Sequence, residues 1–361
     1  MFSRGIAVLT LTRHGIETSV KIKKVLEALG YPCMIYAPSK IIHEGIFPME
    51  TRLDDFIREK YQTSDALVAV MATGIIIRAV APYLQSKLID PAVIGVDTKG
   101  RFIISLLSGH YGGANELTHL IAEGIGAMPV ITTASEVLGK HSIDTIARAL
   151  HLKIVNPNSL VAVNGSLVND GKMGLIFVGD LNIPTDIIHG YNIEKADSIE
   201  KAIEVSNKYD AVGIITQESF SPKKIKKPAT FLKPKNIILG IGARKEITEN
   251  QIIDAIKTAL ARVRISLERV DGLATADIKK ESQSMTQAAE TINLKFKYFT
   301  IEQLNSVKHP DLSPDSEMVK EKIGVGGVSE RAAILAAGKN PKLILKKQKL
   351  NGVTVAIAEG E

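Results

Sequence analysis

Runs of apolar residues alternate with amphipathic stretches along the first third of the chain. Residues 5–11 and 33–36 predict short strands, and the stretch between them has one apolar and one charged face, as a helix does. Residues 66–71 predict another strand, which is followed by a turn and a helix reaching Ala81. This β-α-β order is typical of a parallel sheet covered by helices.

Two further short strands, 92–97 and 102–106, are joined by a polar turn, which predicts a hairpin. A clear amphipathic helix begins after Gly113, and residues 129–133 predict one more strand. Residues 1–139 are therefore predicted to form an N-terminal α/β domain.

The pattern changes after this domain. Short apolar runs at 161–163, 174–178 and 211–215 lie between Asn, Asp and Gly turns and predict strands. We therefore predict a small, strand-containing middle region over residues 140–220. The Lys- and Pro-rich segment 221–235 is predicted to be a solvated linker.

Residues 236–361 resume the α/β pattern with an apolar run at their start. Thr248 and Gln251 have the spacing of a capping box that begins a helix, and a second helix is predicted near 329–338. Two short apolar runs close the chain as strands. The predicted fold class is thus α/β, with an N-terminal domain, the middle region and a second, C-terminal α/β domain.

Composition excludes several classes of protein. The chain has 361 residues, 45% of them hydrophobic, but no uninterrupted apolar run long enough to span a membrane. The N-terminus lacks the long apolar segment of a signal peptide, so we expect a cytoplasmic protein. Cys33, the single cysteine, permits neither an internal disulfide nor a cysteine-based zinc site and is expected to be a small buried hydrophobe.

The formal charge of +6 does not indicate nucleic-acid binding. Much of the excess lies in the predicted linker, and aromatic residues do not alternate with basic ones as a base-stacking surface requires. We expect neither nucleic acid nor a membrane as a partner. No cluster of His and Cys at metal-ligand spacing occurs, so no metal held by the protein is expected.

Three short polar segments with glycine or paired hydroxyls each follow a predicted strand in the N-terminal domain. Such loops meet at the carboxyl edge of a parallel sheet, where ligands bind, so we predict that the three lie together. In the first, Gly74 would let a ligand approach, Thr73 offers a hydroxyl at a helix start, and Arg78 could hold a carboxylate. Equally, Thr73 could be a helix N-cap and Arg78 a surface charge.

The second segment, residues 107–116, is the most specific in the chain. Its glycines lead directly into a predicted helix, whose free N–H groups attract anions. The candidate catalytic residues are His110, Glu116 and Ser108; the candidate substrate contacts here are Gly109, Gly112, Gly113 and Asn115.

The third segment places Thr132 and Thr133 after a strand, where their hydroxyls could bind a substrate carboxylate. The alternative is a capping box between Thr133 and Glu136.

Glycine-rich turns in the C-terminal half are incomplete as dinucleotide fingerprints. Gly240 and Gly242 lead to Lys245 where the last glycine should stand, and Gly324 and Gly326 lead to Ser329. Nucleotide cofactors are therefore not expected, although such turns still suit anions.

Several of these segments together resemble one family, cobalamin biosynthesis protein G. They are residues 71–78, 106–117 and 129–134 in the N-terminal half, and 240–242, 274–279, 324–326 and 353–358 in the C-terminal half. The similarity covers nearly the whole chain. Ala243 departs from it, since the family often has Cys there.

The resemblance implies a cobalt-precorrin-5A hydrolase. Its substrate is a carboxylate-rich cobalt tetrapyrrole whose ring-A acetate is closed as a δ-lactone; water opens the lactone, and the meso carbon leaves with its methyl as acetaldehyde. The cobalt arrives with the substrate, and no other cofactor is implied. Neighbouring enzymes of the pathway and a second copy of the chain are the other candidate partners.

This chemistry suits the candidate residues. His110 could act as general base, with backbone N–H groups near Gly112 and Gly113 holding the oxyanion. Peripheral carboxylates would be bound by Thr73, Arg78, Thr132 and Thr133, and the C-terminal module would add contacts through Gly240, Gly242, Thr275, Lys279, Gly324 and Gly326. Two other classes stay open, a non-catalytic tetrapyrrole carrier and a nucleotide-dependent oxidoreductase.

Overall fold

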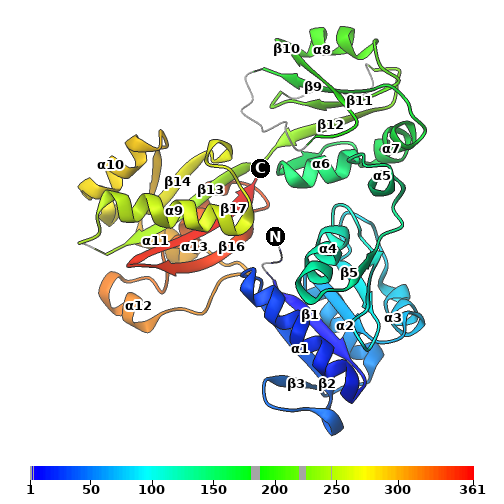
Figure 1. Cartoon of the computed structure of the whole chain (residues 1–361). Helices are drawn as coiled ribbons and strands as arrows, with labels where there is room; N and C mark the ends of the chain where they lie inside the picture. Colours follow the sequence, from blue (N-terminus) through cyan, green and yellow to red (C-terminus); the bar gives the residue numbers. More distant parts are fainter. Residues whose placement is uncertain (1, 3, 180–187, 219–224, 245) are drawn as a thin grey trace. The chain divides into compact units, whose positions relative to one another are not determined.

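The computed structural model describes residues 2, 4–179, 188–218, 225–244 and 246–361. They form two compact units, 2–234 and 235–361, which contain three mixed sheets with helices against them (Figure 1). The α/β fold class predicted from the sequence is confirmed.

The N-terminal part of the first unit is a seven-stranded sheet in the order β3-β2-β1-β4-β5-β6-β7. Its strands are β1 (Ile6–Thr10), β2 (Cys33–Pro38), β3 (Ile46–Met49), β4 (Ala66–Val70), β5 (Ala92–Val96), β6 (Phe102–Leu107) and β7 (Met128–Val130). Its helices are α1 (Arg13–Ala28), α2 (Leu53–Thr63), α3 (Thr73–Val80) and α4 (Ala114–Ile125).

Helices cover this sheet, and its central strands, β1 and β4, are therefore buried at every position. Helices α2 and α3 pack against Ala7 and Leu9, and α1 and α4 lie side by side, with Gly124 against Val25. Cys33 is buried, as predicted.

One hairpin decides where the loops of this sheet lie. The strands β1 to β5 are parallel to one another, but β6 is antiparallel to β5, with Val93 opposite Leu107, and β7 is parallel to β6. The loops after β6 and β7 therefore share one edge of the sheet, the one at which strands β1 to β5 begin. The loop after β4 lies at the opposite edge, at which those strands end. The prediction that all three candidate loops meet is wrong.

The described residues of the middle region form a five-stranded sheet in the order β10-β9-β11-β12-β8. Its elements are β8 (Leu152–Ile154), β9 (Met173–Val178), β10 (Asn192–Ala196), β11 (Ala211–Ile215), β12 (Ala229–Pro234), α6 (Ile143–Ala149), α7 (Leu160–Val168) and α8 (Ile199–Ser206), with α5 (Ala134–Val137) preceding them.

Two predictions about this region are wrong. Residues 161–163 lie in α7, whose buried Leu160, Val163 and Leu167 have helical spacing. Residues 229–234 of the predicted linker form β12, which pairs with β11 and is mostly buried, so the middle sheet extends to Pro234. The prediction for 221–224 lies outside the described residues.

The C-terminal unit is a five-stranded sheet in the order β15-β14-β13-β17-β16. Its strands are β13 (Asn236–Ala243), β14 (Gly272–Ala276), β15 (Phe296–Phe299), β16 (Lys342–Leu350) and β17 (Val353–Gly360); its helices are α9 (Glu249–Val263), α10 (Gln283–Thr291), α11 (Ile301–Ser306), α12 (Glu317–Ile323) and α13 (Ser329–Ala337).

Alternate residues of β13 face opposite sides of this sheet. Ile237 and Leu239 pack with α9 and α10, and Ile238 packs with α13. The predicted capping box of Thr248 and Gln251 begins α9. Within the described ranges, none of the helices combines the length and apolar character that crossing a bilayer would need.

Candidate functional site

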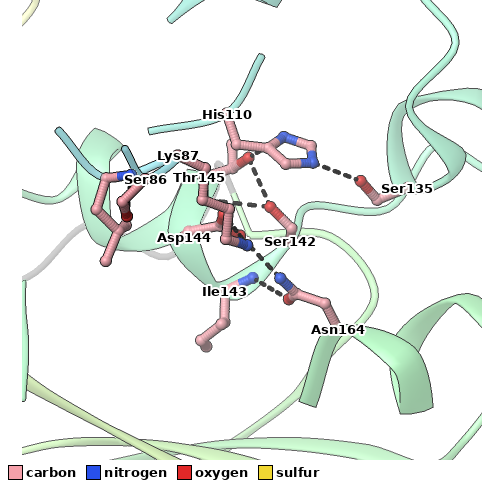
Figure 2. A network of polar contacts seen from close by, with 10 residues as sticks. Ser86, Lys87, His110, Ser135, Ser142, Ile143, Asp144, Thr145 and Asn164 are labelled. Carbon is pink, nitrogen blue, oxygen red and sulfur yellow. Dashed lines mark hydrogen bonds and ion pairs between the residues drawn. The ribbon is translucent and has the colours of Figure 1, made fainter. Parts of the chain in front are cut away.

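The imidazole of His110 lies between two hydroxyl groups at one edge of the N-terminal sheet (Figure 2). Its Nε2 is 3.2 Å from Oγ of Ser135, and its Nδ1 is 2.9 Å from Oγ1 of Thr145. Ser135 belongs to α5, in the segment that follows β7, and Thr145 belongs to the first turn of α6. The loop after β6 is thus joined to the start of the middle region through this histidine.

The surroundings of His110 favour its neutral form. Burial lowers the pKa of His110 from its ordinary value, and this effect outweighs the nearby carboxylates of Asp144 and Glu136, which act in the opposite direction. The side chain is half-buried. A neutral imidazole at neutral pH can accept a proton, as a general base must.

A buried carboxylate, that of Asp144, lies near this histidine. Asp144 is 0% exposed, and its oxygens accept hydrogen bonds from Nζ of Lys87 at 3.0 Å and from Nδ2 of Asn164 at 2.9 Å. Burial raises the pKa of Asp144, but the hydrogen bond from Ser142 and the charge of Lys87 outweigh it and hold that pKa below its ordinary value. Asp144 is therefore an ionised acceptor.

The three glycines of the loop are explained by contacts within the protein. A Cβ on Gly109 would lie 2.6 Å from Oδ1 of Asn115, and one on Gly112 would lie 2.4 Å from Cβ of Ser108. Gly113 has a φ of 88° and faces the guanidinium of Arg148. These glycines allow other atoms of the protein to approach closely, so the glycines by themselves do not indicate a ligand.

Two predicted site residues hold the loop in place. Glu116 forms an ion pair of 2.9 Å with Arg148, whose guanidinium also donates to the carbonyl of His110. Asn115 is buried and bridges Ser105 of β6 to Thr133. The sequence predicted Glu116 as catalytic and Asn115 as a substrate contact, but both are engaged in internal contacts.

The first N–H groups of α4 are also engaged. The N–H of Gly113 donates to the carbonyl of His110 at 3.1 Å, and that of Ala114 donates to the carbonyl of Ser108 at 3.1 Å. The N–H of Gly113 is thus bonded within the protein, and the oxyanion role of the backbone N–H groups near Gly112 and Gly113 stays a prediction. Ser108 itself has a φ of 56°, an uncommon conformation for a residue other than glycine.

The segment after β7 contributes in a way that the sequence did not single out. Thr133 is the N-cap residue of α5 without a side-chain capping bond, so the alternative of a capping box with Glu136 is wrong. Thr132 is exposed at the same edge as His110. Ser135, which the sequence analysis did not select as a site residue, is the residue that meets Nε2 of His110.

The loop after β4 lies at the other edge of the sheet. Thr73 is the first residue of α3 and Ala72 is the N-cap, so Thr73 does not cap the helix. The exposed guanidinium of Arg78 donates to the carbonyl of Gly74 at 3.0 Å, within its own helix. Thr73, Gly74 and Arg78 thus do not share a site with His110.

The C-terminal candidates, described within their own unit, are mostly packing residues. A Cβ on Gly240 would clash with the carbonyl of Ser329, and one on Gly242 would lie 2.5 Å from Oγ1 of Thr354. The buried hydroxyl of Thr275 donates to the carbonyl of Ile241 at 2.7 Å. Among the predicted contacts of this unit, Lys279 is a half-buried cation that follows β14.

Local structure explains why two further positions of this unit are glycines. Gly324 ends α12 with a φ of 80°, and a Cβ on Gly326 would overlap the carboxylate of Asp315. In the described part of the chain, no three His, Cys, Asp or Glu side chains are gathered as a metal site requires.

Most residues around His110 escaped sequence analysis because they come from another part of the chain. Lys87 precedes β5, and Ser142, Asp144 and Thr145 begin α6. The one signal that could have found them is the Ser-x-x-Thr start of α6, in which Ser142 is the N-cap residue.

Comparison with known proteins agrees with this architecture. Family profiles described as "Cobalamin synthesis G N-terminal" and "Cobalamin synthesis G C-terminus" match residues 55–136 and 237–358. A protein of Salmonella typhimurium named cobalt-precorrin-5A hydrolase is 31% identical over 98% of this chain and 97% of its own, and one of the same name from Priestia megaterium is 28% identical over 98% and 94%.

A solved structure is similar to this chain over nearly the whole length of both. It is a cobalamin biosynthesis protein G homolog from Sulfolobus solfataricus, 26% identical, with a TM-score of 0.62 over 100% of this chain and 98% of that one. The expectation drawn from the sequence motifs is confirmed: the chain belongs to the cobalamin biosynthesis protein G family.

Proposed function

We propose that the chain is a cobalt-precorrin-5A hydrolase that opens the ring-A δ-lactone of its substrate and releases acetaldehyde. The names of its relatives support the substrate. The observation that carries the assignment to a site is the half-buried His110, whose pKa is lowered by burial and whose two ring nitrogens face hydroxyl groups.

Lactone hydrolysis requires a base and an activated water. In the proposed reaction, His110 takes a proton from water as the oxygen adds to the lactone carbonyl carbon. The ring C–O bond then breaks, leaving a carboxylate on ring A and a hydroxyl on the meso carbon. Loss of the hydroxyl proton then forms the C=O bond of acetaldehyde as the C–C bond between the meso carbon and the macrocycle breaks, and the electron pair of that bond passes to the macrocycle.

We confine the proposed site to the edge of the sheet that carries His110. Thr132 is exposed at that edge and is the proposed contact for a peripheral carboxylate. Glu116 is not proposed as the base, because Arg148 neutralises it. The cobalt is carried by the substrate, and no further cofactor is part of the proposal.

The test is a reaction of the purified chain with cobalt-precorrin-5A without added nucleotide. We expect the ring-opened product and one acetaldehyde per substrate, and His110→Ala should lower kcat by about 100- to 10,000-fold. His119→Ala, an exposed histidine of α4, is the control. Tight substrate binding without acetaldehyde would instead favour the carrier, and a strict need for NADPH would favour an oxidoreductase.

A further inference from the structure

Two side chains of α6 contact opposite ends of His110. Oγ1 of Thr145 lies 2.9 Å from Nδ1 of the imidazole, and Nη1 of Arg148 donates to the backbone carbonyl of His110 at 3.2 Å. Residues three apart lie on the same face of a helix, so one face of α6 contacts both the ring and the backbone of this histidine. The contact with the ring is present whichever of its two atoms donates the proton.

The other face of α6 belongs to the core of the middle region. Ile143, Ile146 and Ala147 are buried there in one cluster with residues of α7, β9 and β11. At 3.6 residues per turn, these three positions lie on the side of the helix opposite to Thr145 and Arg148. The position of the histidine therefore depends on the middle sheet as well as on the N-terminal sheet.

The first turn of α6 is held by side chains from two other segments. Asn164 of α7 accepts a hydrogen bond from the backbone nitrogen of Ile143 at 3.0 Å and donates to the carboxylate of Asp144 at 2.9 Å. Lys87, from the segment before β5, bonds to the same buried carboxylate at 3.0 Å. These contacts oppose a shift of the helix start, as is required of an element that orients a reacting side chain.

Arg148 is suited to hold the loop because its planar guanidinium serves two acceptors at once. Nη1 donates to the carbonyl of His110, and Nη2 lies 2.9 Å from the carboxylate of Glu116 in the first turn of α4. The arginine side chain is only 14% exposed. A lysine ammonium is a single point of charge on a flexible stem and could not keep both contacts in this geometry.

We propose that the middle region is part of the active site, in which Thr145 and Arg148 are positioning residues for the imidazole of His110. Thr145 fixes the direction of the ring, and Arg148 fixes the backbone from which the ring projects. The proposal gives a role to a region in which the sequence analysis named no candidate site residue. That the oriented imidazole acts as a base rests on the proposed function, whereas its orientation by α6 does not.

The experiment measures acetaldehyde release by full-length variants. Thr145→Val replaces the hydroxyl by a methyl group of similar shape, so it removes the contact with Nδ1 and keeps the volume of the side chain. We expect kcat to fall about 10- to 100-fold with KM nearly unchanged, because a misdirected base slows the reaction and leaves binding intact. Thr145→Ser, which keeps a hydroxyl, should restore most of the lost kcat.

Thr118→Val is the matched control. Thr118 is a buried threonine of α4, and its hydroxyl has no hydrogen-bond partner among the described residues, so this substitution should leave both kcat and KM unchanged. Arg148→Lys should lower kcat in the same way as Thr145→Val. If Arg148→Lys does not fold, Thr145→Val and its control decide the matter.

A combination with His110→Ala distinguishes positioning from a merely structural role. If Thr145 acts through the imidazole, Thr145→Val should cause no further fall in kcat once the imidazole is absent. A fall of the same size in both backgrounds would overturn the proposal, and so would a Thr145→Val variant whose kinetics match those of Thr118→Val.

A measurement without substrate separates this proposal from the proposed function. In ¹H–¹³C NMR spectra of protein with labelled histidine rings, assigned with His110→Gln, we expect one sharp set of His110 signals in the wild type and in Thr118→Val. Thr145→Val should broaden or double these signals, and spectra identical to those of the wild type would contradict orientation by α6. If the signals change as expected but the wild type releases no acetaldehyde, the positioning stands and the proposed hydrolysis fails.

Discussion

The guanidinium of Arg148 is held 2.9 Å from the carboxylate of Glu116, and it lies over Gly113, the N-cap residue of α4. The two charged side chains are 14% and 28% exposed. Together they join the start of α4 to α6. This pair explains why an acidic residue and a glycine stand at the helix start, where the sequence suggested substrate contacts.

Gly113→Val should destabilise the protein rather than impair binding alone. A Cβ would lie 2.3 Å from Nη2 of Arg148, and the φ of 88° is strained for any L side chain. We expect a loss of about 1–3 kcal/mol in the free energy of unfolding, measured by urea denaturation. Gly126→Val is the control, because Gly126 has a φ of 71° but nothing within 4 Å of its Cβ position. Equal losses for the two variants would contradict a role for Arg148.

Glu116→Gln should retain activity within about tenfold of the wild type, because the carboxylate is bound to Arg148 and is not the base. The amide still offers an oxygen to the guanidinium. Steady-state kinetics with cobalt-precorrin-5A measure the effect. A loss as large as that of His110→Ala would return the role of base to Glu116.

The pH profile of kcat/KM should follow His110 in the free enzyme. A base works in its neutral form, so activity is present at high pH and falls as pH decreases through the histidine pKa. Because burial lowers the pKa of His110, the acid limb should lie below about 6.5. Asp144, Glu136, Lys87 and Arg148 are the charged groups that act on it.

Two substitutions should shift the acid limb of this profile in opposite directions. Lys87→Ala removes a cation that lowers the pKa of His110 and should move the acid limb to higher pH. Glu136→Gln removes an anion that raises the same pKa and should move the limb to lower pH. Shifts in the opposite directions would show that another group is titrating.

Arg78→Ala should leave KM within about threefold, because Arg78 lies at the other edge of the sheet and bonds to its own helix. Thr132→Val should raise KM without changing kcat, as expected for a contact present in both ground and transition states. Measuring the two variants side by side tests where the substrate binds. A large rise in KM for Arg78→Ala alone would move the binding site to the edge beside α3.

Local sequence was sufficient for most elements of both units. The β-α-β order of the first strands, the hairpin between β5 and β6, the capping box of α9 and the last two strands each depend on patterns within a few residues. α7 and β12 were missed for a local reason. Because α7 is apolar on nearly all sides, its sequence lacks the pattern of an amphipathic helix, and we predicted a strand there. β12 lies within a charged, proline-containing segment, which we predicted to be a linker.

The sequence already implied that the three candidate loops lie at two different edges of the sheet. Reversing β6 turns the chain to the other edge of the sheet, so the loops after β6 and β7 could not meet the loop after β4. Predicting all the loops at one edge treated the sheet as wholly parallel, although the predicted hairpin already required an antiparallel pair.

The sequence by itself determined the family, the α/β class and the presence of His110 in a glycine-rich loop before a helix, because these depend on neighbouring residues. Only the tertiary structure decided what surrounds that histidine. Ser135 and Thr145 are 25 and 35 residues away along the chain, and the glycines face Asn115, Ser108 and Arg148 rather than an open site. The physical reason is that hydrogen bonds and steric exclusion act between atoms close in space, and nothing in a local pattern specifies which distant side chains the fold brings there.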